Sequence, residues 1–309
     1  MKITVEIPDR VDKAVARAYP SAGRRQIGEL FDDTVVRVNG KKAKKGDRVA
    51  AGDVIDLERE PASGDALRPV ADPTVVLDIL VERPDLVAIA KPAGVPSQPL
   101  RAGELGTIAN GLAARFPECA AIGDDPRDGG LVHRLDIGTS GVLIAARTPE
   151  AYRALRDAFG AGTIDKQYLA ITDGRPVSRE CDAPLAQRGK KAVVDHTDGL
   201  AAHTAFTVEA ATATHALVRC VASTGRMHQV RAHLANVGAP ITGDALYGGE
   251  ALDETGDGRD PARPAAPPHG GADVIDGFFL HAARLVHGDL VVDAPEPARF
   301  TAARQRLGL

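Results

Sequence analysis

The feature that most limits the fold is a series of short apolar runs that recur through the larger part of the chain. Runs of this length are typical of β-strands, and longer helical patterns lie between them at 107–116, 150–159 and 227–237. The predicted strands are Val75–Leu80, Leu86–Ala90, Val142–Ala145, Tyr168–Ile171, Thr204–Val208, His215–Val221, Phe279–Val286 and Leu290–Val292. Because strands outnumber helices, we predict an α+β domain with a mixed, antiparallel-rich curved sheet and a central cleft.

The first 60 residues predict a separate small α/β domain. Two short helical patterns, Val11–Ala18 and Arg24–Phe31, precede strands that turn at Asn39-Gly40 and again at Gly52-Asp53. An Asn-Gly pair between apolar residues is a strong hairpin signal. We therefore predict a small domain over residues 1–60, a linker rich in Pro, Ala, Asp and Gly over residues 61–74, and a large domain over residues 75–309.

A second segment of low complexity, residues 248–277, contains the run DGRDPARPAAPPHGGAD. Such a composition cannot supply a packed core, so we predict a flexible surface insertion.

Composition narrows the possible locations and ligands. The 309 residues carry a net charge of -4, contain no Trp and only 4% aromatic residues, and include no run of ~20 apolar residues that could cross a bilayer. The start of the chain also lacks the apolar core of a secretory signal. Three scattered cysteines without a CxxC pair fit a reducing compartment and no zinc site. We expect a cytoplasmic protein without a membrane or metal partner.

A basic cluster marks the turn of the small domain. It consists of Lys41, Lys42, Lys44, Lys45 and Arg48. Such a cluster can neutralise the phosphates of a nucleic acid, or it can be a solvated turn that keeps a small domain soluble. The charges alone do not decide between the two.

Asp136 lies in a polar centre between two apolar runs, in GLVHRLDIGTSGVL. Gly138 and Gly141 bracket a turn before the next strand, so Asp136 is expected on a loop held by rigid sheet, where catalytic residues often lie. An Asp near Gly and Thr can equally cap its own turn. Arg134 supplies a nearby cation.

A second polar centre, STGRMHQVRAHL, begins the predicted helix over 227–237. Met227, Val230, Leu234 and Val237 have the spacing of a buried helical stripe. Arg226, Gln229 and His233 are predicted on another face, with Arg226 at the first turn, where it could meet a carboxylate or phosphate. An amphipathic helix with a polar outer face is the simpler alternative.

Other chemistries lack their motifs. His228 and His233 are five residues apart rather than four, so they do not form a helical metal pair. The chain has no G-x-S-x-G elbow, no Walker loop and no dinucleotide-binding fingerprint.

Several sequence blocks of the chain, taken together, resemble those of the RluA-type pseudouridine synthases. The stretch GGLVHRLDIGTSGVLIAART resembles the family's signature, and further blocks follow the family's order: VAIAKPAGVP, KQYLA, GRMHQVRAHL, GAPITGDALYG and LHAARL. They span roughly residues 75–300. The first domain resembles a small RNA-binding module named after a small-subunit ribosomal protein.

The resemblance implies roles for individual residues. Asp136 is implied as the catalytic aspartate, Tyr168 as the tyrosine packed on the target base, and Arg226 as the arginine paired with the aspartate. No cofactor or metal is implied. Substrate contacts are expected from His133, Arg134, Thr139, Ser140, Lys166, His228, Gln229, Arg231 and Leu280. The chain departs from the family at Ile137-Gly138, beside the aspartate, where charged residues are usual.

The expected reaction is conversion of uridine to pseudouridine in a structured ribosomal or transfer RNA, by a protein expected to be a monomer. Asp136 would attack the sugar or remove a sugar proton, and the sequence leaves both open. An RNA-binding assembly factor without catalysis and an N-glycoside hydrolase are the alternatives. The first would lack one of the three central residues, and the second would release free base.

Overall fold

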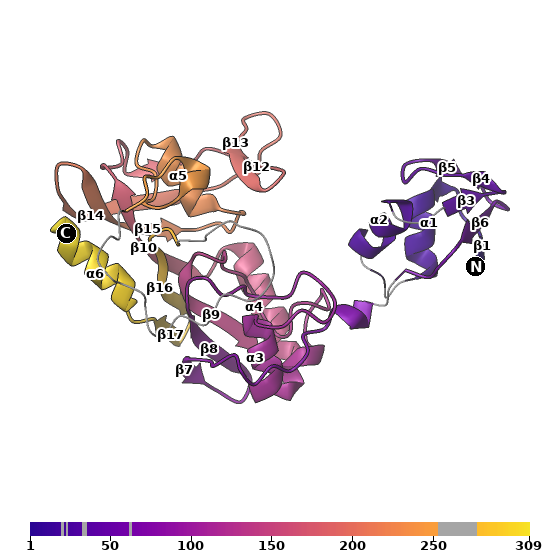
Figure 1. Cartoon of the computed structure of the whole chain (residues 1–309), viewed down its shortest axis with the longest axis horizontal. Helices are drawn as coiled ribbons and strands as arrows, with labels where there is room; N and C mark the ends of the chain where they lie inside the picture. Colours follow the sequence, from indigo (N-terminus) through magenta and orange to yellow (C-terminus); the bar gives the residue numbers. More distant parts are fainter. Residues whose placement is uncertain (20–21, 23, 33–35, 62–63, 253–276) are drawn as a thin grey trace.

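The computed structural model describes residues 1–19, 22, 24–32, 36–61, 64–252 and 277–309. The predicted insertion at 248–277 lies almost entirely outside these residues. Figure 1 shows the elements along the chain, from β1 at the N-terminus to α6 near the C-terminus. No helix of the described chain is long and apolar enough to cross a membrane.

Residues 1–57 build a small sheet with two helices. Its strands follow the order β1 (Lys2–Thr4), β6 (Val54–Leu57), β3 (Val36–Val38) and β4 (Lys41–Lys42), and β2 (Asp9–Arg10) pairs with β5 (Arg48–Val49). The helices are α1 (Val11–Ala18) and α2 (Arg24–Asp32). The cluster of buried hydrophobic residues described for this part contains residues from Val5 to Leu57 only, so it is a core of its own.

The Asn39-Gly40 hairpin is confirmed. Both residues have positive φ, 49° and 80°, as a type I′ turn requires. The Asn39 side chain closes the loop, because its amide donates to Asp53 at 2.8 Å and its oxygen accepts from the Val54 amide at 2.9 Å.

The described residues of the large part form a mixed, antiparallel-rich sheet of nine strands, which confirms the predicted fold class. The order is β11 (Glu180–Cys181), β14 (Thr204–Ala211), β15 (His215–Ala222), β10 (Asp165–Asp173), β16 (Leu280–His287), β9 (Ser140–Ala146), β8 (Leu86–Lys91) and β7 (Ile79–Glu82), with β17 (Leu290–Asp293) also paired to β16. The pairing of β16 with β9 is parallel. A separate hairpin joins β12 (Leu185–Arg188) to β13 (Lys191–Val194).

Helices cover both faces of this sheet, which explains why its central strands are almost continuously apolar. On β8, Ala88 faces α4 (Pro149–Ala161), whereas its neighbours Val87 and Ile89 face α3 (Ile108–Arg115). In the other half, α5 (Gln229–Asn236) packs on one face of β10 and β15, and α6 (Ala298–Leu307) packs on the other. Three short 3-10 helices are described, at Gly64–Leu67, Pro117–Ala121 and Ala245–Tyr247.

Several predicted boundaries differ from the structure, and two of the differences have a clear local cause. The strand predicted at Val75–Leu80 begins only at Ile79, because the Asp72 carboxylate accepts from the amide and hydroxyl of Thr74 and holds a turn there. The helix predicted from Met227 begins at Gln229, because His228 has a left-handed backbone with φ 51°.

Gly141 is where the two halves of the sheet join. Its φ is +116°, and a Cβ built on it would lie 2.2 Å from the carbonyl oxygen of Ala282 on β16. We expect Gly141→Ala to lower the free energy of unfolding by about 3 kcal/mol, because it adds both backbone strain and overlap with main-chain atoms. Urea denaturation measures this change.

The control is Gly160→Ala on α4. No atom lies within 4 Å of a Cβ at that position, so the control should be at least as stable as the parent. Equal unfolding midpoints for Gly141→Ala and the parent would contradict this account of the junction.

Candidate active site

The loop that carries Asp136 is fixed through its main chain. The Thr139 amide donates to the Asp136 carbonyl at 3.0 Å and closes a turn. Lys91, at the end of β8, donates from Nζ to the carbonyls of Ile137 at 3.1 Å and Thr139 at 2.8 Å. Burial lowers the pKa of Lys91 to about 7, and the charge of Asp136 opposes that shift. The loop is therefore held from behind by a buried amine.

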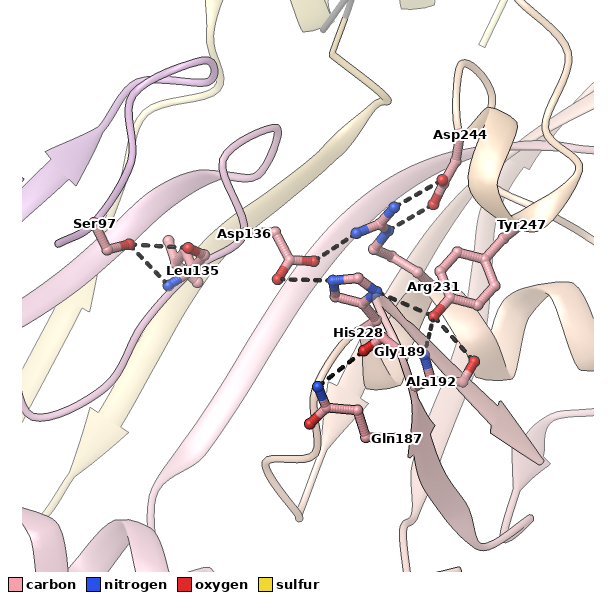
Figure 2. Close-up of polar contacts among 10 residues, drawn as sticks. All are labelled: Ser97, Leu135, Asp136, Gln187, Gly189, Ala192, His228, Arg231, Asp244 and Tyr247. Atoms are coloured by element: carbon pink, nitrogen blue, oxygen red, sulfur yellow. Dashed lines mark hydrogen bonds and ion pairs between the residues drawn. The ribbon is translucent and has the colours of Figure 1, made fainter. Parts of the chain in front are cut away.

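Ser97 braces the same loop on its other side (Figure 2). Its hydroxyl donates to the Leu135 carbonyl at 2.9 Å and accepts from the Leu135 amide at 3.2 Å. With both main-chain groups of the preceding residue bound, Asp136 has little freedom to move.

Arg231 joins Asp136 to a second carboxylate. Its Nη1 donates to Asp136 at 2.9 Å, while Nε and Nη2 donate to the two oxygens of Asp244 at 2.7 and 2.9 Å. The Asp244 side chain is 1% exposed and that of Asp136 is 29% exposed. The guanidinium also lies over the rings of Phe278 and Tyr247, at 4.2 and 5.1 Å. Burial opposes its charge, but the carboxylates outweigh burial and raise the pKa of Arg231.

The expected pairing of Arg226 with Asp136 is wrong. Arg226 is exposed, and its Nε donates to the carbonyl of Ala201 at 2.9 Å. The physical reason is the left-handed His228, which breaks the helical spacing between Arg226 and α5. Arg231, two residues inside the helix, takes the place beside Asp136.

His228 faces Asp136 from the start of α5. Its Nε2 lies 3.7 Å from the carboxylate, and its Nδ1 lies 3.1 Å from the hydroxyl of Tyr247. Burial lowers the pKa of His228, so the ring is neutral at neutral pH and carries one proton. The Tyr247 hydroxyl also contacts the amide of Ala192 on β13 (Figure 2).

A pocket of about 80 Å³ opens beside Asp136. Tyr168 on β10 and Leu280 on β16 supply part of its apolar wall. Burial, and secondarily the charge of Asp136, raises the pKa of Tyr168 well above its usual range, so the phenol keeps its proton. The pocket is lined by Arg134, Leu135, Asp136, Thr139, Tyr168, Ala222, Thr224, Gly225, Arg226, His228, Gln229, Val230, Arg231 and Leu280.

Three predicted substrate contacts fall outside this lining. His133 stacks on Phe159 with ring centroids 4.6 Å apart, and burial lowers its pKa to about 3. Ser140 is buried in contact with His281 at 2.9 Å. Lys166 donates to the carbonyl of Thr224 at 3.0 Å and so supports the pocket from behind.

Sequence reasoning missed Lys91, Asp244 and Tyr247. A signal existed for the first two, because a lysine that ends an apolar strand and an aspartate inside an apolar block both need buried partners. The position of Tyr247 depends on the hairpin contact, which its sequence neighbours do not reveal. Among the described residues, no group of three His, Cys, Asp or Glu side chains could hold a metal ion.

Comparison with known proteins identifies related chains. The family model described as RNA pseudouridylate synthase matches residues 85–236. A ribosomal large subunit pseudouridine synthase D from Yersinia pestis is 32% identical over 291 residues, covering 91% of this chain and 83% of that protein. An uncharacterized RNA pseudouridine synthase from Chloroflexus aurantiacus is 37% identical over 245 residues, covering 78% of this chain and 75% of the relative.

A solved structure supports the fold. The human RNA pseudouridylate synthase domain containing 4 superposes with a TM-score of 0.55 at 24% identity, covering 75% of this chain and 93% of that one.

The two arginines can be separated by experiment. Arg231→Lys keeps a positive charge but cannot hold two carboxylates, so we expect pseudouridine formation to slow by at least ~100-fold. Arg226→Lys, on the exposed rim, is the matched control and should stay within about threefold of the parent at saturating RNA. The reverse ranking of the two variants would restore Arg226 as the partner of Asp136.

Proposed function

The chain belongs to the RNA pseudouridylate synthase family and converts uridine in RNA to pseudouridine, and we propose that Asp136 carries this reaction on large-subunit ribosomal RNA. The observation that supports the role of Asp136 is its position. Of the two carboxylates bound by Arg231, Asp136 is the partly exposed one, and it lines the pocket. The relative from Yersinia pestis is a ribosomal large subunit pseudouridine synthase, which supports the choice of RNA.

The chemistry requires an anion beside the sugar. The reaction breaks the bond from base nitrogen N1 to ribose C1′, turns the uracil and joins its C5 to C1′. The proton on C5 leaves and N1 gains one, so the composition is unchanged and no cofactor is consumed. Asp136 attacks the sugar or removes a sugar proton, and Arg231 stabilises the charged form of the carboxylate.

Tyr168 and Leu280 receive the base. A stacked uridine cannot reach Asp136, so the nucleotide must flip out of the RNA into the pocket. The ring of Tyr168 offers a flat surface for uracil, and its hydroxyl keeps a proton that it could donate.

The rim of the pocket binds the RNA backbone. Arg134 and Arg226 are exposed there, and Thr139, His228 and Gln229 also line the pocket. Exposed guanidinium groups beside a base pocket suit phosphate, which they bind without regard to sequence.

The small N-terminal domain adds a second RNA contact. Lys41 and Lys42 lie on β4, Lys44 and Lys45 lie in the loop that follows it, and Arg48 begins β5. All five side chains are exposed, so they are accessible to phosphates. We place this domain at residues 1–60, joined by a linker at 61–74, in a cytoplasmic monomer.

The alternative functions can be distinguished by their reaction products. A glycoside hydrolase would release free uracil, and an assembly factor would leave the RNA unmodified. A transfer RNA substrate would place the pseudouridines elsewhere. Mapping pseudouridines in ribosomal and transfer RNA from a strain that lacks this protein separates these possibilities.

Replacing the carboxylate tests the mechanism. Asn is nearly isosteric with Asp but is neither a charged nucleophile nor a base, so Asp136→Asn should lower pseudouridine formation by at least ~100-fold. RNA affinity should be largely retained, because phosphate contacts supply most of it. Quantitative pseudouridine mapping and a binding titration measure the two effects.

The control is Asp157→Asn, on an exposed position of α4, which should behave as the parent. A folded Asp136→Asn protein that modifies RNA at the parental rate would refute the role of Asp136. That result would support the view that Asp136 only caps its turn.

The basic turn is tested by salt dependence. Replacing Lys41, Lys42, Lys44 and Lys45 by Gln should weaken RNA binding and reduce the slope of log affinity against log salt by up to about 3.6, since each lost phosphate contact contributes about 0.7–0.9. The rate on bound RNA should not change. An unchanged slope would mean that these lysines are only solvated.

A further inference from the structure

Tyr247 is buried between the catalytic pocket and the β12–β13 hairpin. It ends a short 3-10 helix three residues after Asp244. Two cations lie over its ring, with Arg231 at 5.1 Å and Lys191 of the hairpin at 4.8 Å from the centroid. The ring also meets His228 edge-on, with centroids 5.8 Å apart. The phenol is thus enclosed by groups that belong to the pocket and to the hairpin.

The hydroxyl has more possible partners than it has protons. The amide N–H of Ala192 donates to its oxygen at 2.9 Å, which uses one lone pair. Two acceptors then compete for the single phenolic proton, each at 3.1 Å: the Ala192 carbonyl and Nδ1 of His228. The choice between them decides which nitrogen of His228 carries the ring proton.

The charge of Asp136 favours one of these two arrangements. If Tyr247 donated to the Ala192 carbonyl, His228 would carry its proton on Nδ1 and turn the bare lone pair of Nε2 toward a carboxylate 3.7 Å away, which is repulsive. If Tyr247 donates to Nδ1, the proton sits on Nε2 and points to Asp136. The second arrangement is favoured electrostatically.

The backbone of His228 also indicates that its orientation matters. A non-glycine residue with φ 51° is uncommon, and such a conformation persists only where the surrounding structure stabilises it. Here that conformation puts the imidazole between Asp136 and Tyr247 at the start of α5.

We propose that Tyr247 is a positioning residue that fixes the Nε2–H tautomer of His228 against Asp136. The consequence for the reaction rests on the proposed role of Asp136, whereas the tautomer itself does not. With its proton on Nε2, His228 stabilises the carboxylate in the free enzyme and presents a donor to the pocket. Tyr247 and Asp136 favour the same tautomer, but the Asp136 contact of 3.7 Å is longer than a hydrogen bond. Without the Tyr247 hydroxyl, Nδ1 loses its donor and only this weaker contact favours Nε2–H, so the Nδ1–H tautomer is populated as well.

The tautomer can be measured on the full-length protein without RNA. Long-range nitrogen–proton correlation of the uniformly ¹⁵N-labelled protein distinguishes protonated from bare ring nitrogens, and His228→Asn identifies the signals by their loss. Asn is chosen because it tolerates positive φ. We expect Nε2 of His228 to be protonated and Nδ1 to be bare. A proton on Nδ1 in the parent would overturn the proposal, whatever the activity.

The effect on the reaction is measured with Tyr247→Phe, which keeps the ring and removes only the hydroxyl. We expect a mixture of His228 tautomers, RNA affinity within about twofold, and a single-turnover rate on an unmodified large-subunit ribosomal RNA transcript lower by about tenfold. The matched control is Tyr152→Phe on α4. The Tyr152 hydroxyl donates to Asp128 at 2.8 Å, and neither residue lines the pocket. The control should keep the parental rate and tautomer.

A double variant tests whether Tyr247 acts through His228. If it does, adding Tyr247→Phe to His228→Asn should produce no further loss of rate. Independent, additive losses would overturn the proposal, as would a Tyr247→Phe protein with the parental rate. If Asp136→Asn proves fully active, the function assigned to Asp136 fails, but the tautomer measurement still stands by itself.

Discussion

One guanidinium group sets the electrostatics of the pocket. Arg231 gives two hydrogen bonds to Asp244 and one to Asp136, so one cation serves two anions. Burying such charges is costly, and leaving one of them unpaired typically costs ~3–5 kcal/mol. The bidentate pair with Asp244 and the rings of Phe278 and Tyr247 offset that cost. Asp136 receives the single remaining bond and keeps part of its surface open, which is why we propose Asp136 and not Asp244 as the reactive carboxylate.

The second constraint is the rigidity of the Asp136 loop. Lys91 binds the carbonyls of Ile137 and Thr139, and Ser97 binds the main chain of Leu135 at the start of the loop. The strand after the loop then makes the close contact of Gly141 with Ala282. None of these contacts uses the Asp136 carboxylate. The loop is therefore fixed by its main chain while the side chain stays available, as a preorganised site requires.

Local structure could be predicted where local chemistry determines it. The Asn39-Gly40 turn and helix α1 depend on neighbouring residues, and both lie where the sequence predicts them. The stripe Val230, Leu234 and Val237 also packs as expected, but Met227 joins the cluster around the hairpin instead. The wrong pairing of Arg226 has the same cause. The prediction extended the helical spacing across His228, whose backbone is left-handed and precedes α5. Gln229 and His233, inside the true helix, do share a face and contact Thr204.

Long-range pairings could not be predicted in this way. The partners of Lys91 lie 46 and 48 residues away, and Arg231 is 95 residues from Asp136. Such contacts depend on strand order, here on β9 lying between β8 and β16, which hydrophobic period does not specify. The family resemblance singles out Asp136 as a prediction, but only the fold places Asp244, Tyr247 and His228 around it (Figure 2).

The RNA that we propose for this pocket creates an electrostatic conflict, because its phosphates carry the same charge as the carboxylate that they approach. The chain as a whole is acidic, with a net charge of -4, so the conflict must be resolved locally. Arg231 compensates Asp244 and Asp136 in the interior, while Arg134 and Arg226 lie at the exposed edge of the same pocket. Lys166 behind the rim adds charge, although burial and the nearby Arg226 lower its pKa. A phosphate at the edge therefore meets cations first, and the anion it would repel is already paired behind them.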